Sequence, residues 1–240
     1  MSVLVLRLAG PLQSWGSSSR FARRHTEGQP TKSGILGLIA AAQGRRRSDP
    51  IEDLLGLELA VRTEQQGVLL RDFHTAHHQI TGSSMPLTER FYWADAVFTA
   101  YVGGPRPVVE GLSAALQDPA FPLYFGRRSC VPEGRIVLGV EDTPVADAVA
   151  MTPWVPGFAG RRRARKQATV RLAVQADAAV YPEELVSREL SDVPLSWDPE
   201  NRRYRNRMVI NTFVEVATGN MGVAEASGTH DPMAVLGGGV

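Results

Sequence analysis

The first forty-odd residues constrain the fold most, because they read as a buried strand that runs into a tight turn and a basic loop. Val3–Leu8 is an apolar run interrupted only by Arg7. Its length and the Gly10 and Pro11 that follow it favour a strand over a helix. Residues 16–31 are rich in Ser, Arg and Gly, which is typical of a surface loop.

A helix is expected directly after this loop. Thr31 or Ser33 can cap it, and residues 35–42 are apolar nearly all round, so the helix should be buried on more than one side. Small residues recur along one side of it at three- and four-residue spacing: Gly34, Gly37 and Ala41. They indicate either close packing on a sheet or close approach of a nucleic-acid backbone. The first amides of such a helix have no intrahelical partners, which makes its start a candidate anion site.

The middle of the chain predicts strands and helices around one sheet. Strands are expected over 57–63, 68–75, 95–102 and 135–140, a short helix over 49–55 and a longer helix over 107–117. A turn at Gln66 and Gly67 should pair the first two strands as a hairpin. The order strand, helix, hairpin, strand, helix, strand is typical of the ferredoxin-like α+β class.

Two other regions are less regular. Residues 76–94 have little periodicity and should project from the sheet. Beyond residue 141 we expect a basic run over 161–166, strands over 169–175 and 207–216, and no element in the acidic stretch 177–200. Gly, Asn and Ala dominate from Thr218 onward, which predicts a disordered tail over 218–240.

Charge is unevenly distributed although the 240-residue chain has a formal net charge of only +1. Residues 1–48 contain eight Lys or Arg and one acid, Glu27, which favours an anionic partner such as nucleic acid. A hydrophobic share of 43% excludes disorder of the whole chain. The single cysteine, Cys130, is expected to be a buried thiol. With no signal peptide or apolar span, we expect a soluble cytoplasmic protein without membrane contact.

The available chemistry is mainly positive charge and aromatic stacking. Three histidines, His74, His77 and His78, lack the further ligands of a zinc site, so no metal or other cofactor is expected. Acid-base cleavage of RNA would need His74, His77, Tyr92 and Lys32 to converge, which the sequence does not show. Arginine clusters with aromatic residues between them suit a single-stranded nucleic acid. Gly16 and the serines after it place Trp15 at a loop edge, where it could stack on a base.

Four segments closely resemble the CasD family of the RAMP superfamily, which is a CRISPR-associated subunit of the type I-E Cascade complex. They are LAGPLQSWG at 8–16, PTKSGILGL at 30–38, LRDFHT at 70–75 and YFGRRSC at 124–130. The resemblance covers residues 1 to about 140 well and fades between 141 and 205.

The resemblance implies a ferredoxin-like palm, related to the RRM and RAMP folds, with a projecting β-hairpin thumb and a less regular C-terminal part. The palm would comprise 1–75 and 95–145, the thumb 76–94, and residues 146–217 would complete the palm. The family's role is to hold the five-prime handle of crRNA and to cap the CasC backbone filament, without catalysis. CasA would dock beside this subunit, CasE would cut the RNA, and target DNA would be met only indirectly within the complex.

The residues expected at the RNA follow from the same motifs and from the basic loop. They are Gln13, Ser14, Trp15, Arg20, Arg23, Arg24, Thr31, Lys32, Ser33, Arg127 and Arg128, with thumb contacts from Arg90, Tyr92 and Trp93. Lys32 would grip phosphate. Because relatives in type I-C systems process RNA, the main alternative is a metal-independent crRNA endoribonuclease. A second alternative is an adaptor whose arginines meet only acidic proteins.

Overall fold

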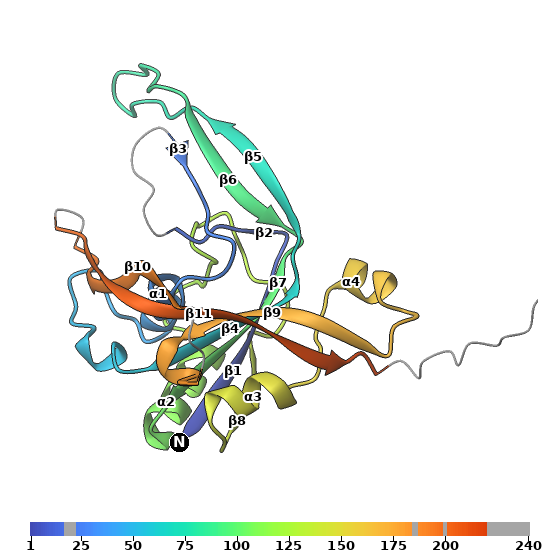
Figure 1. Cartoon of the computed structure of the whole chain (residues 1–240). Coiled ribbons are helices and arrows are strands. Elements are labelled where there is room, and N and C mark those ends of the chain that lie inside the picture. The colour runs from blue at the N-terminus through green and yellow to red at the C-terminus, as the bar shows by residue number, and fades with distance from the viewer. Residues whose placement is uncertain (17–22, 184–186, 199–200, 220–240) are drawn as a thin grey trace, which may run out of the picture.

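The computed structural model describes residues 1–16, 23–183, 187–198 and 201–219, and it has a mixed α+β architecture with two sheets (Figure 1). In the described residues the large sheet has seven strands, in the order β10-β11-β9-β4-β7-β1-β8, and all neighbouring pairs are antiparallel. Its strands are β1 (Ser2–Ala9), β4 (Glu58–Gln65), β7 (Val97–Gly104), β8 (Val137–Glu141), β9 (Thr169–Asp177), β10 (Ser187–Ser196) and β11 (Arg203–Ala217). The expected α+β class is confirmed.

Helices cover both faces of the large sheet, and the alternation of β1 explains how. Leu4, Leu6 and Leu8 belong to a core that includes apolar residues of α1 (Lys32–Ala42) and α2 (Arg106–Gln117). Val3 and Val5 point to the opposite face, where they join a second core with α3 (Val145–Met151). Because side chains alternate along a strand, the apolar run at the N-terminus supplies both cores. The predicted strand, the predicted cap at Thr31 and both longer predicted helices are confirmed.

A smaller sheet forms a ribbon that projects from the body (Figure 1). Its two long strands, β5 (Val68–His74) and β6 (Thr88–Ala94), are antiparallel partners. The short strands β2 (Leu12–Gln13) and β3 (Arg23–Arg24) pair with β6, β2 at its inner end and β3 in parallel further out.

The expected hairpin between 57–63 and 68–75 is wrong. β4 lies between β9 and β7 in the large sheet, so both of its edges are already paired and it cannot pair with β5. The chain leaves the large sheet at Gly67, whose φ is +71°, and a Cβ there would lie 2.4 Å from the carbonyl oxygen of Ala94. Residues 68–75, which the sequence assigns to the palm, are therefore part of the ribbon.

The structure also corrects the C-terminal half. The acidic stretch contains the ten-residue strand β10, and two short helices, α3 and α4 (Phe158–Arg163), occupy a region where none is expected. The predicted helix over 49–55 is only a 3-10 turn at Glu52–Leu54. Most of the predicted tail, residues 220–240, lies outside the described residues. No helix in the described part is long and apolar enough to cross a membrane.

Candidate nucleic-acid interface

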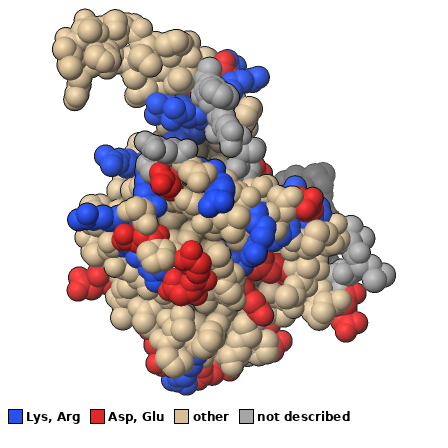
Figure 2. All heavy atoms as spheres, turned by 90° about the vertical axis from the view of Figure 1, so that its left-hand side faces the viewer, with Lys and Arg blue, Asp and Glu red and all other residues tan. Residues whose placement is uncertain are grey.

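Charged side chains are gathered on the body of the molecule, and the outer part of the ribbon carries none. Figure 2 shows Lys and Arg on the body below the ribbon, interspersed with Asp and Glu. Residues 73–88, at the outer end of the ribbon, include no Asp, Glu, Lys or Arg. A polyanion would therefore be attracted to the body and not to the end of the ribbon.

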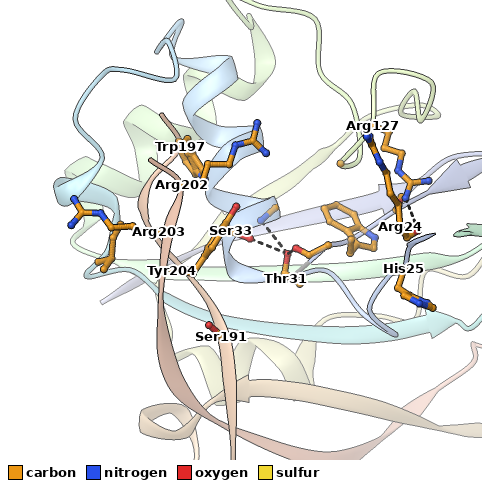
Figure 3. Close-up of a pocket in the computed structure, with 16 residues that line it drawn as sticks. Arg24, His25, Thr31, Ser33, Arg127, Ser191, Trp197, Arg202, Arg203 and Tyr204 are labelled. Carbon is orange, nitrogen blue, oxygen red and sulfur yellow. Dashed lines mark hydrogen bonds between the residues drawn. The ribbon is translucent and has the colours of Figure 1, made fainter. Parts of the chain in front are cut away.

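The body carries a cleft of about 1060 Å³ between the start of α1 and the hairpin formed by β10 and β11. Six residues predicted from the sequence line it: Ser14, Trp15, Arg24, Thr31, Ser33 and Arg127. Figure 3 shows Arg24 and Arg127 on one side, Trp197, Arg202 and Arg203 on the other, and Thr31 and Ser33 between them. Positive charge thus lies on both walls of the cleft.

Sequence reasoning missed the wall formed by β10 and β11. Its residues in the cleft are Ser191, Leu195, Trp197, Arg202, Arg203 and Tyr204, and His25 is a further unpredicted lining residue. The available signal was a group of aromatic and basic residues within 197–205, namely Trp197, Arg202, Arg203, Tyr204 and Arg205, but the acidic stretch that overlaps it hides the strand before it. β10 pairs with β11 and packs against α1, which brings this wall to the start of that helix.

Trp15 is a structural support of this cleft, and the expectation of an exposed stacking ring is wrong. Its side chain is only 1% exposed, and its ring centroid lies 5.7 Å from that of Phe125. Its Nε1 donates to Oε1 of Gln13 over 3.1 Å. A Cβ on Gly34 would lie 2.7 Å from the indole ring, so the first glycine of the small-residue stripe allows α1 to pack on Trp15.

Gln13 and Ser14 are also buried and hold the turn in place. The amide of Gln13 donates to the carbonyl oxygens of Leu8 and Ala96 over 3.0 and 2.8 Å. The hydroxyl of Ser14 donates to the carbonyl oxygen of Phe91 over 3.2 Å, which joins the turn to the ribbon. Two of the predicted contact residues therefore shape the site from beneath.

The side chain of Lys32 is bound to groups inside the protein, so the expectation that it binds phosphate is wrong. The residue is 6% exposed, and its Nζ donates to the carbonyl oxygen of Leu57 over 2.7 Å and to Oδ2 of Asp177 over 3.0 Å. Its backbone amide donates to Oδ2 of Asp192 over 2.7 Å. The positive end of the α1 dipole thus already interacts with a carboxylate of β10, that of Asp192.

Arg207 completes this buried network. Its guanidinium bonds Asp192 through Nε and Nη2 at 2.7 and 2.9 Å, and Asp177 through Nη1 at 2.5 Å. Burial alone would lower the pKa of Arg207, but the hydrogen bonds and negative charges of Asp192 and Asp177 raise it above its ordinary value. The guanidinium stays charged, so the network fixes the hairpin of β10 and β11 against the start of α1.

Arg127 ties the opposite wall to the ribbon. Its guanidinium lies 4.5 Å from the ring centroid of Tyr92 and donates to the carbonyl oxygens of Phe91 and Arg24 over 3.2 and 2.9 Å. The ring of His25 stacks on Phe91 at 4.9 Å. Tyr92 is only 5% exposed, so its expected contact with RNA is replaced by support of Arg127.

A second cleft, of about 810 Å³, continues from the first along α1. The two share five lining residues: Ser33, Gly34, Gly126, Trp197 and Arg202. We call the joined clefts the basic trough. The second part is lined by Gly37 and Ala41 of the small-residue stripe, and to the shared Arg202 it adds four cations: Arg45, Arg46, Arg47 and Arg128. Arg45 is held by Asp53, whose pKa its hydrogen bonds lower, whereas Arg46, Arg47 and Arg128 are exposed.

The other predicted contact residues lie outside the trough or outside the described chain. Arg23 bonds Glu89 over 3.2 Å on the ribbon, and Nε1 of Trp93 donates to the carbonyl oxygen of Glu27 over 2.7 Å. Arg90 lies on β6 and is partly buried. Arg20 falls outside the described residues.

The structure does not gather the residues of the catalytic alternative. Lys32 and Tyr92 are buried with the partners given above, and His77 lies in the loop at the outer end of the ribbon, within hydrogen-bond distance of Ser84. His74 ends β5. Within the described residues no group of three His, Cys, Asp or Glu could hold a metal ion. Cys130 is fully buried as expected, and burial raises the pKa of its thiol.

Comparisons with known proteins agree on one family. A family model described as CRISPR-associated protein (Cas_Cas5) matches residues 3–210. The chain is 33% identical over 158 residues to the CRISPR system Cascade subunit CasD of Escherichia coli (strain K12), and the match spans 58% of this chain and 70% of that protein. It is also similar to a chain of a CRISPR RNA-guided surveillance complex, with a TM-score of 0.72, 34% identity and coverage of 91% and 92%. A crystal structure of a Cas protein matches with a TM-score of 0.69, 33% identity and coverage of 88% and 94%.

Proposed function

Because the chain belongs to the CRISPR-associated Cas5 family, we propose that it is a non-catalytic RNA-binding subunit of a Cascade surveillance complex. In this role it holds the five-prime handle of crRNA in the basic trough. The resemblance to the CasD family noted in the sequence is confirmed. The observation that carries the proposal is the trough itself, which has cations on both walls and small residues along α1 between them.

The composition of the trough suits a single strand. Arg24, Arg127, Arg202 and Arg203 can neutralise phosphates at one end, and Arg46, Arg47 and Arg128 at the other. Trp197 lines both clefts and is partly exposed, so it can offer a stacking face where the strand passes α1. Charged grooves with interspersed aromatic rings bind single strands through the backbone and through base stacking.

The arrangement of the elements supports the finer assignment of palm and thumb. The partial order β8-β1-β7-β4, with α1 and α2 packed on one face, suits a ferredoxin-like palm. The ribbon of β5 and β6 would be the thumb, and its uncharged outer end would meet a protein such as the neighbouring CasC subunit. CasA would dock beside the trough, and target DNA would be met through the assembled complex.

The test is binding of labelled crRNA with an intact or a scrambled handle, measured over a range of salt concentrations. The intact handle should bind more tightly, and Arg202→Ala/Arg203→Ala should lower the salt slope by about 0.7 for each phosphate of the single strand that is no longer neutralised. The matched control is Arg135→Ala/Arg188→Ala, which removes two exposed cations that line neither part of the trough. Equal affinity for the two RNAs would refute the proposal.

The same samples test the catalytic alternative. Repeat RNA incubated with the full chain in EDTA should stay intact. Specific cleavage that disappears in His74→Ala or His77→Ala would instead establish a metal-independent endoribonuclease.

A further inference from the structure

A second basic surface is separate from the trough and plays no part in the function proposed above. Residues 161–171 contain six cations, and no Asp or Glu occurs between 148 and 176. The cations are Arg161, Arg162, Arg163, Arg165, Lys166 and Arg171. They belong to α4, to the turn after it and to the start of β9. We call this set the α4 patch.

The α4 patch lies across the base of the ribbon from the trough. Figure 1 shows α4 on the opposite side of the ribbon's base from α1 and β10. Gln65, at the end of β4, accepts a hydrogen bond from the backbone amide of Gly160 over 2.6 Å. The same side chain donates to the carbonyl oxygen of Asp95 over 2.5 Å, at the inner end of the ribbon. Trp154 adds a hydrogen bond from Nε1 to the carbonyl oxygen of Glu64 over 3.1 Å. The helix is therefore fixed in position.

Five of the six cations of the patch have no acidic partner in the described chain, whereas the sixth, Arg171, lies opposite Glu215 of β11 and 4.2 Å from the ring centroid of Phe213. Arg161, Arg162, Arg163, Arg165 and Lys166 are all exposed, and none of them forms an ion pair within the described chain. The nearby carboxylate of Glu64 is fully buried and paired with Arg62 at 2.6 Å, so it does not offset them. Because like charges held together repel one another, five free cations on one fixed surface favour an anionic partner.

The shape of the patch indicates which polyanion it fits. None of the three clefts described for this chain is lined by the residues of α4 or by the turn after it. The aromatic ring of α4, Phe158, is 82% exposed and lines none of these three clefts, so it is not part of a groove that tracks a single strand. Duplex DNA needs no such groove, because it presents a stiff and dense row of phosphates along its outer surface.

We propose that the α4 patch is a second nucleic-acid-binding surface, which takes the phosphate backbone of a double helix. Arg162, Arg163, Arg165 and Lys166 would contact successive phosphates, and the contact would be independent of base sequence. The trough would hold a single strand on the opposite side of the ribbon's base. One chain would then contact two nucleic acids at once.

The test uses the full chain and a short labelled DNA duplex of arbitrary sequence, with affinity measured as a function of salt concentration. Arg162→Ala/Arg163→Ala should weaken duplex binding and reduce the slope of log affinity against log salt by about 1.8, or about 0.9 for each phosphate that is no longer neutralised. Arg162→Lys/Arg163→Lys should retain most of the slope. The control Arg135→Ala/Arg188→Ala removes the same charge elsewhere and should change the slope much less. Circular dichroism confirms that each variant is folded.

Arg165→Ala/Lys166→Ala repeats the test outside the helix, in case the first variant does not fold. Equal slopes for the patch variants and the control would overturn the proposal, as expected if the surface meets an acidic protein. The proposal would also be overturned if the patch variants lost affinity only for single-stranded RNA and not for the duplex. Handle RNA is measured in parallel and should bind the patch variants unchanged. Failure of the handle preference alone would count against the function proposed for the trough and leave this inference standing.

Discussion

At the scale of single residues, the most consequential side chain is Asp192, which the sequence gives no reason to single out. It is fully buried and accepts hydrogen bonds from the backbone amide of Lys32 and from Arg207. Its carboxylate therefore joins the N-terminal helix to the C-terminal hairpin. Buried pairs of this kind add little net stability over apolar residues, but removing one partner leaves the other charge buried and uncompensated.

Replacing Asp192 should therefore be costly. Asp192→Ala leaves the guanidinium of Arg207 with one carboxylate fewer, and we expect a loss of about 3–5 kcal/mol in the free energy of unfolding, measured with urea. Asp53→Ala is the matched control, because it breaks an exposed pair with Arg45 and should cost about 1 kcal/mol or less. Similar losses for the two variants would show that the network does not hold the hairpin.

At the scale of elements, the small residues of helix α1 determine which side chains can pack against it. Gly34 and Gly37 look equivalent in the sequence, but the structure places them against different neighbours. A Cβ at Gly34 would meet the ring of Trp15 at 2.7 Å, whereas at Gly37 its nearest neighbour is Cζ2 of Trp197 at 3.8 Å. The stripe thus serves packing at its first position and lines the trough at its second.

Substitution by alanine should separate these two roles. Gly34→Ala should lower the melting temperature, because the start of α1 must move away from Trp15. Gly37→Ala fits in ordinary contact and should raise the stability by up to about 1 kcal/mol, since alanine is the better helix former. Thermal unfolding followed by circular dichroism measures both, and a stabilised Gly34→Ala would contradict the packing role.

The elements that the sequence predicts correctly are those with strong local patterns. β1, α1, α2 and β9 each have an apolar run or a helical period that needs no distant partner to be recognised. What could not be predicted depends on distant pairing. Lys32 reads as exposed because the acids that bury it, Asp177 and Asp192, are 145 and 160 residues away in the sequence. β10 was missed because its inward Asp192 interrupts the apolar alternation.

At the scale of the whole molecule, the ribbon leaves much of its own apolar surface exposed. Large apolar side chains lie exposed on β5 and at the outer end of the ribbon: Val68, Leu69, Leu70, Phe73, Ile80, Met85 and Leu87. An exposed apolar surface of this extent is typical of a segment that is covered by a partner.

We therefore expect the ribbon to become protected on assembly. Limited proteolysis should cleave within 76–94 in the isolated chain and much more slowly in a complex that contains the neighbouring subunits and crRNA. The body of the same chain, whose strands are paired in both states, provides the internal reference. Equal cleavage rates in the free and assembled chain would show that the ribbon is not a docking element.

Arg127 has a mechanical consequence for such an assembly. Its guanidinium contacts the short strand β3 through Arg24 and the ribbon strand β6 through Phe91 and Tyr92, and the residue itself lines the trough. A change in the angle of the ribbon would therefore shift this wall of the trough, where RNA is proposed to bind. Coupling of this kind is reciprocal, so a partner that fixes the ribbon would tighten the hold on RNA by the same factor by which RNA strengthens that partner's grip. Arg127 would then couple the binding of a partner at the ribbon to the binding of RNA in the trough.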